Sequence, residues 1–235
     1  MASQSKKYRA IVFDLFGTLV DEDATRVRQT LVDIARLLRM PEALLMHAWR
    51  ESRGRRNTGQ FGRDPREMFD NLCTLVGVSP PSDMLDEAVN RYVNGRREGL
   101  TPREGVITTL ESLKKKKIAT AVISNCSIEL PEIWPLSELA PHFKAAVFSA
   151  AVGVMKPDPA IYQMALDQLR LKADQCLYVG DGGDGELTAA REAGMETVLI
   201  RVPYDDPGLY GQHEESLSWD GPRIESIEEV LGLVG

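Results

Sequence analysis

FDLFGTLV, residues 13–20, is the stretch that organises this chain. Mostly apolar residues 9–13 lead into Asp14, and Gly17 and Thr18 follow it closely. A carboxylate at the end of a buried strand can attack phosphorus or carbon and form a covalent intermediate. A simpler reading is an Asp that only bonds to the turn after the strand. The segment therefore offers a candidate nucleophile at the end of a first strand.

The composition describes an acidic, globular chain. It has 235 residues, 43% of them hydrophobic, and a net charge of -7. The negative charge argues against nucleic acid or an acidic membrane as a partner, and no apolar run reaches the ~20 residues of a transmembrane helix. The first residues run into the strand without a secretory signal, and three well-separated cysteines suit a reducing compartment. We expect a cytoplasmic protein that is a monomer or homodimer.

Short apolar runs alternate with helical patterns through most of the chain. The candidate strands are Ala10–Phe13, Ile118–Ser124, Ala145–Phe148, Cys176–Val179 and Thr197–Ile200. Such runs are typical of a parallel sheet covered by helices on both faces. Asp158-Pro159 reads as the start of a helix. The sequence therefore predicts an α/β core.

Residues 21–100 lack a clear strand. Asp64 and Pro65 form a helix start, Gly77 can end that helix, and Ser82 can cap the next one. We expect an all-helical domain at 21–100, inserted into a core made of 1–20 and 101–235. The tail from 203 to 222, rich in Gly, Pro and Asp, is expected to be irregular.

Two further segments carry polar groups at the ends of predicted strands. Ser124 and Asn125 close the strand IATAVISN, where a hydroxyl and backbone N–H groups can bind an oxyanion. Asp181 follows another strand in YVGDGGDGE, and a carboxylate there is a candidate Mg²⁺ ligand. Asp184 and Glu186 can orient water around that ion. Simpler readings are a helix cap for the first pair and an ordinary acidic loop for the second segment.

Lys156 lies in GVMKPDPAIY, between a Gly and Pro-Asp-Pro. Its charge can offset a nucleophilic carboxylate and the anionic group of a substrate, although a lone Lys is usually solvated. Asp14, Ser124, Lys156, and Asp181 with Glu186 match, in this order, the four motifs of the haloacid dehalogenase-like hydrolase superfamily. The chain resembles that superfamily over residues 9–200.

The resemblance implies a Rossmann-like three-layer α/β/α sandwich with its site at the carboxyl ends of the strands. The helical stretch resembles the cap that many members carry after the first motif. By the same resemblance, Asp14 is the nucleophile and binds Mg²⁺ together with Asp181 and the backbone carbonyl of Phe16. Ser124, Lys156 and Thr18 would then bind the oxygens of the transferred group.

Phe16 departs from the pattern of the superfamily's phosphatases. They carry a second Asp two residues after the nucleophile, and its acid–base help is worth about 10²–10⁴-fold. A Mg²⁺-dependent phosphatase can do without it if its leaving group is good or if the cap supplies an acid. The 2-haloacid dehalogenases have an aromatic residue at this place, but they lack metal and the Gly180-Asp181 pair. A non-catalytic binding or regulatory protein on the same fold is another alternative.

Phosphonoacetaldehyde hydrolysis, a further activity of the superfamily, needs a cap lysine, and residues 21–100 contain none. Several arginines crowd one part of that stretch instead, namely Arg50, Arg53, Arg55, Arg56, Arg63 and Arg66. They form either an anion-collecting mouth or a solvated face, and Arg53 and Arg56 are the candidates for contact with substrate. We expect Mg²⁺-dependent hydrolysis of a small phosphorylated metabolite, an anionic substrate.

Overall fold

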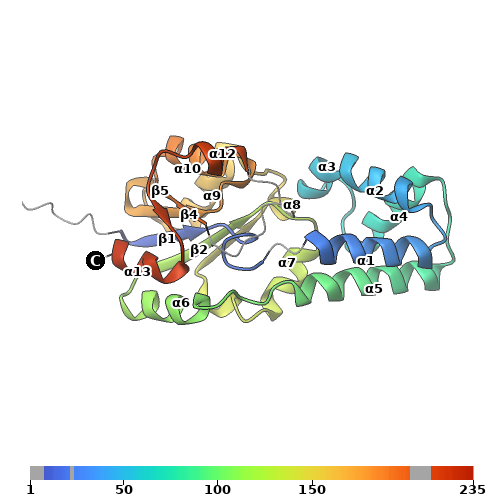
Figure 1. The fold of residues 1–235 in the computed structure, drawn as a ribbon, viewed down its shortest axis with the longest axis horizontal. Coiled ribbons are helices and arrows are strands. Elements are labelled where there is room, and N and C mark those ends of the chain that lie inside the picture. Colours follow the sequence, from blue (N-terminus) through green and yellow to red (C-terminus); the bar gives the residue numbers. More distant parts are fainter. Residues whose placement is uncertain (1–7, 22–23, 202–212, 235) are drawn as a thin grey trace, which may run out of the picture.

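Six parallel strands form the central sheet, in the order β3-β2-β1-β4-β5-β6 (Figure 1). This computed structural model describes residues 8–21, 24–201 and 213–234. The strands are β1 (Ala10–Phe13), β2 (Ala119–Ser124), β3 (Ala145–Phe148), β4 (Cys176–Gly180), β5 (Glu196–Ile200) and β6 (Arg223–Ile224). The five strands predicted from apolar runs are confirmed, with boundaries shifted by at most one residue.

Helices cover both faces of this sheet. In Figure 1, α9 (Pro159–Leu169) and α10 (Glu186–Glu192) lie above it, and α6 (Val106–Lys115) and α13 (Val230–Leu233) lie below it. Alternate residues of β1 enter two separate cores, because side chains along a strand point to opposite faces. Ile11 and Phe13 pack in one core, and Ala10 and Val12 in the other. The predicted three-layer α/β/α sandwich is confirmed.

The remaining elements around the sheet are short. They are α7 (Glu129–Ile133), α8 (Ser149–Val152), α12 (Glu214–Ser218) and the 3-10 turns Trp134–Leu136, Ala140–His142, Ala173–Gln175, Gly183–Gly185 and Ile227–Glu229. None of the helices among the described residues has the length and apolar character that crossing a membrane requires.

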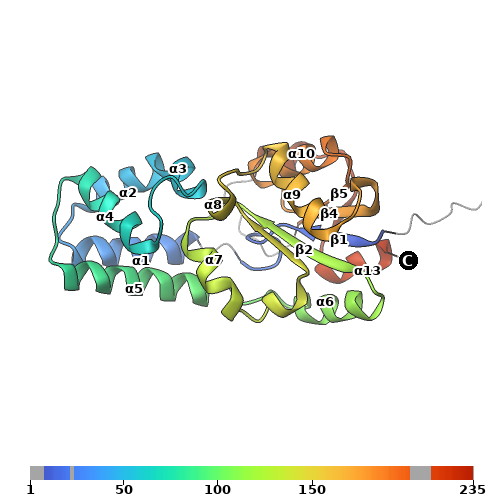
Figure 2. The ribbon, with the colours of Figure 1, turned by 180° about the vertical axis from the view of Figure 1, so that it is seen from behind.

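Five helices lie together at the end of the molecule away from the sheet (Figures 1 and 2). They are α1 (Ala24–Leu37), α2 (Glu42–Glu51), α3 (Arg53–Asn57), α4 (Pro65–Val76) and α5 (Ser82–Glu98). Within residues 24–100 every regular element is a helix. Their apolar faces share a hydrophobic core of their own, which includes Ile34, Leu72 and Tyr92.

The helix starts show how local chemistry sets these boundaries. The side chain of Asp64 accepts a hydrogen bond from the Glu67 N–H at 2.8 Å at the start of α4, and Gly77 ends that helix in the left-handed conformation. Asp158 accepts from the Ala160 N–H at 2.8 Å at the start of α9. These three predicted helix boundaries are confirmed.

Two sequence predictions are wrong. Ser82 does not cap α5, because Pro81 holds the capping position and the Ser82 hydroxyl accepts a hydrogen bond from Arg66 instead. The tail is not irregular throughout, since Glu214–Ser218 forms the helix α12. The part of the predicted irregular tail that precedes residue 213 lies outside the described residues. Strand β6 was missed because two residues are too few to form a recognisable pattern.

Replacing Leu72 by Ala should destabilise the protein, because this side chain is fully buried in the core of the helical segment. We expect the free energy of unfolding, measured by urea denaturation, to fall by about 2–5 kcal/mol. Leu75 on the same helix is 56% exposed, so Leu75→Ala should change it by no more than about 0.5 kcal/mol. Equal losses in the two variants would show that the helical segment does not pack as described.

Candidate active site

Three neighbouring strands deliver candidate site residues to the same edge of the sheet. Asp14 follows β1, Ser124 ends β2, and Asp181 follows β4. Because β1 lies between β2 and β4 and all three run parallel, their carboxyl ends meet. Lys156, between α8 and α9, reaches the same place and contacts Asp14. Four segments that are distant in the sequence therefore converge on one site.

Lys156 is held between two carboxylates. Its Nζ atom donates to Asp14 Oδ1 and to Glu186 Oε2, both at 2.5 Å, and all three side chains are buried. Burial alone would lower the pKa of Lys156, but the charges of Asp14 and Glu186 raise it well above its usual value. The lysine is therefore a fixed positive charge beside the candidate nucleophile.

An acidic cluster surrounds this lysine. One carboxylate oxygen each from Asp14, Asp181 and Glu186 lies within 4.8 Å of the others. Burial, and then the charge of Asp14, raises the pKa of Glu186 to about 8. Burial also raises the pKa of Asp14, with a further contribution from the charge of Asp181. One ammonium group balances only part of the charge of three carboxylates, so this set of oxygen donors fits a hard divalent cation such as Mg²⁺.

Gly17 makes room for this cluster. Its φ is +83°, and a Cβ atom added there would lie 2.0 Å from Asp181 Oδ2. Any larger residue would therefore push the Asp181 carboxylate out of position. The glycine of the opening motif serves the site through this close approach as well as through its turn conformation.

Three buried oxygen atoms near the strand ends have no hydrogen-bond partner within the described structure. They are Asp14 Oδ2, Thr18 Oγ1 and Ser124 Oγ. Buried polar atoms are normally paired, so an unpaired group calls for a ligand, an ion or water. Asp14 and Thr18 belong to the loop after β1, and Ser124 ends the neighbouring strand β2, where the oxygens of a transferred group would need donors and acceptors.

Asn125 connects two other site segments. Its side-chain amide donates to the Lys156 carbonyl at 3.0 Å and to Asp184 Oδ2 at 2.8 Å, and its Oδ1 accepts from the Lys156 N–H at 2.8 Å. The side chain therefore positions the backbone of Lys156. Its hydrogen-bonding groups are engaged within the protein.

Asp184 and Arg53 join the core to the helical segment. Both oxygens of Asp184 accept from Arg53 Nη2 at 2.9 Å. Burial opposes ionisation, but hydrogen bonds from Asn125 and Arg53 lower the pKa of Asp184. The expected role of Asp184, orienting water around a metal, stays a prediction beside these pairings with Arg53 and Asn125.

Arg56 lies in the interior and does not line an open mouth. Its guanidinium stacks on the Trp49 ring, 3.5 Å from the ring centroid, and donates to the Trp49 carbonyl and to the hydroxyls of Ser52 and Ser127. Burial lowers the pKa of Arg56 to about 10.

The structure adds two residues that the sequence did not reveal. His213 Nε2 lies 3.4 Å from Asp181 Oδ2, and Tyr178 donates to Glu186 Oε2 at 2.7 Å. Burial alone would raise the pKa of Asp181, but the hydrogen bond and the charge of His213 lower it. Tyr178 lies two residues before the Gly180-Asp181 pair, so its position in the sequence could have indicated that it lies near the site. Nothing in the sequence links His213 to Asp181.

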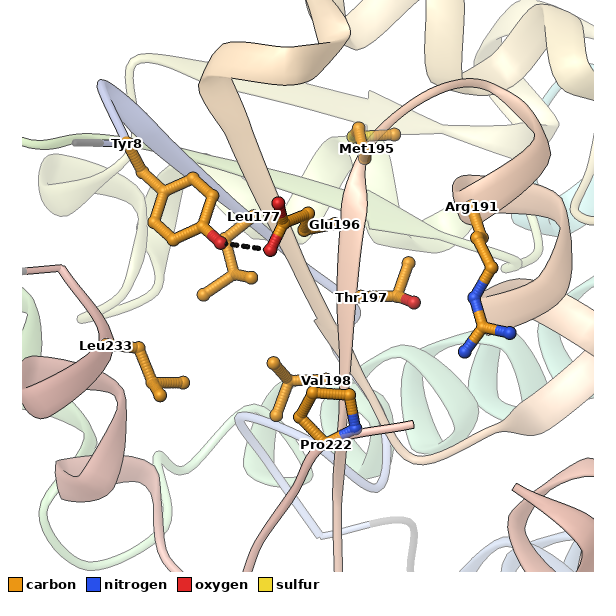
Figure 3. A pocket seen from close by; sticks show the side chains of 9 residues that line it. All are labelled: Tyr8, Leu177, Arg191, Met195, Glu196, Thr197, Val198, Pro222 and Leu233. Atoms are coloured by element: carbon orange, nitrogen blue, oxygen red, sulfur yellow. Dashed lines mark hydrogen bonds between the residues drawn. The ribbon is translucent and has the colours of Figure 1, made fainter. Parts of the chain in front are cut away.

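A separate pocket of about 310 Å³ lies away from these residues (Figure 3). It is lined by residues from the amino ends of β4 and β5, including Leu177 and Glu196. Tyr8 donates to Glu196 within it at 2.5 Å, as the dashed line shows. This pocket opens at the opposite end of the strands from Asp14, so it is not part of the candidate site.

Comparison with known proteins identifies the family. The family described as haloacid dehalogenase-like hydrolase matches residues 8–194. A glyceraldehyde 3-phosphate phosphatase from Methanopyrus kandleri is 31% identical over 179 residues, which are 74% of each chain. (S)-2-haloacid dehalogenase 2 from Pseudomonas sp. (strain CBS-3) is 26% identical over 83% of this chain and 84% of its own.

The fold agrees with solved structures. That of a 2-haloacid dehalogenase from Pseudomonas syringae pv. Tomato DC3000 has a TM-score of 0.70 at 22% identity, and the match covers 97% of this chain and 98% of that one. The family match spans most of the described core and includes Asp14, Ser124, Lys156 and Asp181. The chain therefore belongs to the haloacid dehalogenase-like hydrolases.

Proposed function

We propose that this hydrolase removes the phosphoryl group from a small phosphorylated compound through an aspartyl-phosphate at Asp14, with Mg²⁺ as cofactor. The observation that carries the proposal is the acidic cluster of Asp14, Asp181 and Glu186 around the Lys156 ammonium. A metal-independent site would gain nothing from three buried carboxylates, because their mutual repulsion costs free energy. The similarity to a phosphatase from Methanopyrus kandleri supports the same activity.

The reaction proceeds in two displacements at phosphorus. A carboxylate oxygen of Asp14 attacks phosphorus and forms a P–O bond, while the bond to the leaving oxygen breaks and its electron pair leaves with that oxygen. Water then attacks phosphorus, the bond between phosphorus and the Asp14 oxygen breaks, and its electron pair restores the carboxylate. Inorganic phosphate leaves with both protons of the water. Lys156, Ser124 and Thr18 hold the phosphoryl oxygens in both steps, and their fixed positions reduce the reorganisation that the transition state needs.

Asp14, Asp181 and the backbone carbonyl of Phe16 would hold Mg²⁺, with Glu186 in support. When bound, the ion supplies positive charge that lets the anionic carboxylate and the anionic phosphoryl group approach each other. Helices α1 to α5 act as a cap over this site, and the Arg53–Asp184 ion pair fixes one edge of the cap on the core.

Phe16 favours a second candidate, the metal-independent dehalogenation of a 2-haloacid. Phe16 occupies the position at which the superfamily's phosphatases carry an acid that protonates the leaving group. A halide leaves without a proton, so a dehalogenase does not need that acid. The similarity to the dehalogenase of Pseudomonas sp. is in line with this reaction. The acidic cluster opposes it, because without a cation the Asp181 carboxylate would repel both Asp14 and a carboxylate substrate.

Removing the metal or the nucleophile should abolish phosphate release. We expect purified protein to hydrolyse acetyl phosphate and an aryl phosphate with Mg²⁺ and to lose this activity with a chelator. Asp14→Asn should reduce turnover by about 10⁴-fold or more, the scale seen when a covalent nucleophile is lost. Phosphate release would be followed with a colorimetric assay.

A parallel assay with 2-chloropropionate distinguishes the second candidate. Halide release that persists in chelator, together with no release of phosphate, would contradict the phosphatase assignment. Leu75→Ala serves as a folded control for all of these assays, because its side chain lies on the exposed face of α4.

Phe16→Asp should raise the hydrolysis of alkyl phosphates, whose leaving group needs a proton. The gain is bounded by the value of general acid–base help, about 10²–10⁴-fold, and acetyl phosphate should gain little because its leaving group needs no proton. Phe16→Asn is the matched control, since it has the same size as the Asp variant but no acid. Equal rates in the two variants would show that protonation of the leaving group does not limit turnover.

Mg²⁺ should bind more tightly as the pH rises. Since burial, and then the charge of Asp14, raises the pKa of Glu186 to about 8, this carboxyl holds a proton at neutral pH in the metal-free site, and a cation must displace it. We expect the dissociation constant for Mg²⁺ to fall between about pH 6 and pH 8, by up to about tenfold per unit for each proton released. Calorimetric titration in two buffers of different ionisation enthalpy measures both quantities, and a dissociation constant that is independent of pH would refute this account.

A further inference from the structure

A pocket lined by cations lies at the amino ends of β1, β2 and β3, at the end of the molecule away from helices α1 to α5 (Figure 1). Its volume is about 510 Å³. Arg9 precedes β1 and Lys144 precedes β3, whereas Asp14 follows β1. This basic pocket and the candidate active site therefore lie at opposite ends of the strands. Its positively charged lining residues come from separate segments of the chain and are Arg9, Lys116, Lys117, Lys144 and Arg170.

The cations of the basic pocket have no acidic partners. Within residues 8–21, 24–201 and 213–234, none of them forms an ion pair with a carboxylate, and no Asp or Glu lines the pocket. All five residues are exposed. The whole chain contains 35 acidic and 28 basic residues, so a group of cations without an acid runs against its composition. Converging like charges repel one another, and an anion bound among them would relieve that repulsion.

Helix ends account for only part of this positive charge. Lys116 and Lys117 follow α6, Arg170 follows α9, and Lys144 Nζ donates to the carbonyl of Leu169, the last residue of α9, at 3.2 Å. The carboxyl end of a helix carries roughly half a negative charge, so these two ends together offset roughly one cation. The pocket lining carries five cations. Most of the charge is therefore left without a counterpart.

The shape of the basic pocket favours a small ligand over an extended one. Its volume falls within the range of about 300–1,000 Å³ that is typical of small-molecule sites. Apolar side chains also line it, and of these Ile118 and Leu169 are buried. A long polyanion such as nucleic acid would extend beyond the pocket over a chain whose net charge is -7, which repels it.

We propose that the basic pocket binds a small polyanion with triphosphate chemistry, either a nucleoside triphosphate or inorganic triphosphate. Arginine binds phosphate through paired hydrogen bonds, and lysine binds it as a point charge. Linked phosphates carry several negative charges over a short length, so one ligand can contact cations from several segments of the pocket. The site is separate from that of the proposed phosphatase reaction, because no residue of the basic pocket belongs to the acidic cluster.

Calorimetric titration of the wild-type protein with ATP and with inorganic triphosphate tests the proposal. The protein is first freed of Mg²⁺ on a chelating resin, so that hydrolysis contributes no heat. We expect a dissociation constant below about 1 mM at low ionic strength, and at least about fivefold weaker binding in about 0.5 M salt, which screens exposed charges. Inorganic triphosphate that binds at least as tightly as ATP would show recognition of the phosphates alone. Tighter binding of ATP would show that the apolar lining contacts its organic part.

Arg9→Gln combined with Lys144→Gln removes two cations of the pocket that come from different segments. We expect triphosphate binding to weaken by about 5–30-fold, since each exposed ion pair contributes a factor of up to about five. Lys114→Gln combined with Lys115→Gln is the matched control. It removes the same charge from exposed residues of α6 that do not line the pocket, and it should keep the affinity within about twofold.

If the first variant fails to fold, Lys116→Gln combined with Arg170→Gln replaces it, with the same expected loss. The proposal is overturned if neither compound binds below about 1 mM. Equal weakening in the pocket variant and the control, or unchanged binding in the pocket variant, would overturn it as well. Because the titration measures binding without Mg²⁺ and without turnover, its outcome does not depend on whether Asp14 is a nucleophile.

Discussion

The Lys156 ammonium lies 2.5 Å from both Asp14 and Glu186 inside the protein, and the arrangement of the whole candidate site depends on it. Charges this deeply buried persist only when they are paired, and removing one partner typically costs about 3–5 kcal/mol. The surrounding structure secures each member of this group. Asn125 fixes the backbone of Lys156, Tyr178 binds Glu186, and Gly17 admits Asp181. With three carboxylates around one lysine, the site is still short of positive charge, and this deficit is our reason for proposing Mg²⁺.

Phe16 has a contact in the fold that its position in the sequence does not reveal. In the sequence it marks a missing acid, and it leaves open how a leaving group could depart. In the structure its ring lies under Arg96, which Glu129 holds in place from the core. The position at which the family resemblance implies an acid therefore carries an aromatic ring that lies against a guanidinium.

Much of the core could be predicted because its determinants are local or strongly patterned. Buried parallel strands are continuous apolar runs, so β1 and β3 have the boundaries that the sequence predicts. Asp64 and Asp158 cap helices by contacts with residues two or three positions away. The convergence of Asp14, Lys156 and Asp181 followed from strand-end positions and family resemblance together.

The contacts that could not be predicted join segments distant in the sequence. Arg53 with Asp184, Arg96 with Phe16, and His213 with Asp181 each connect the catalytic loops to another part of the fold. No periodicity or spacing reports such pairs, because their side chains meet only after the helices have packed. Arg56 shows the same limit, since a segment of arginines reads as a solvated face although this one is buried on Trp49.

The most direct test of the account is to trap the covalent intermediate. Protein mixed with Mg²⁺ and excess acetyl phosphate would be quenched in acid within milliseconds, digested, and analysed by mass spectrometry for a phosphoryl group on the peptide that contains Asp14. We predict a phosphorylated Asp14 that forms before free phosphate accumulates and is absent when Mg²⁺ is chelated. Release of phosphate with Asp14 unmodified at every time point would contradict nucleophilic attack by this residue.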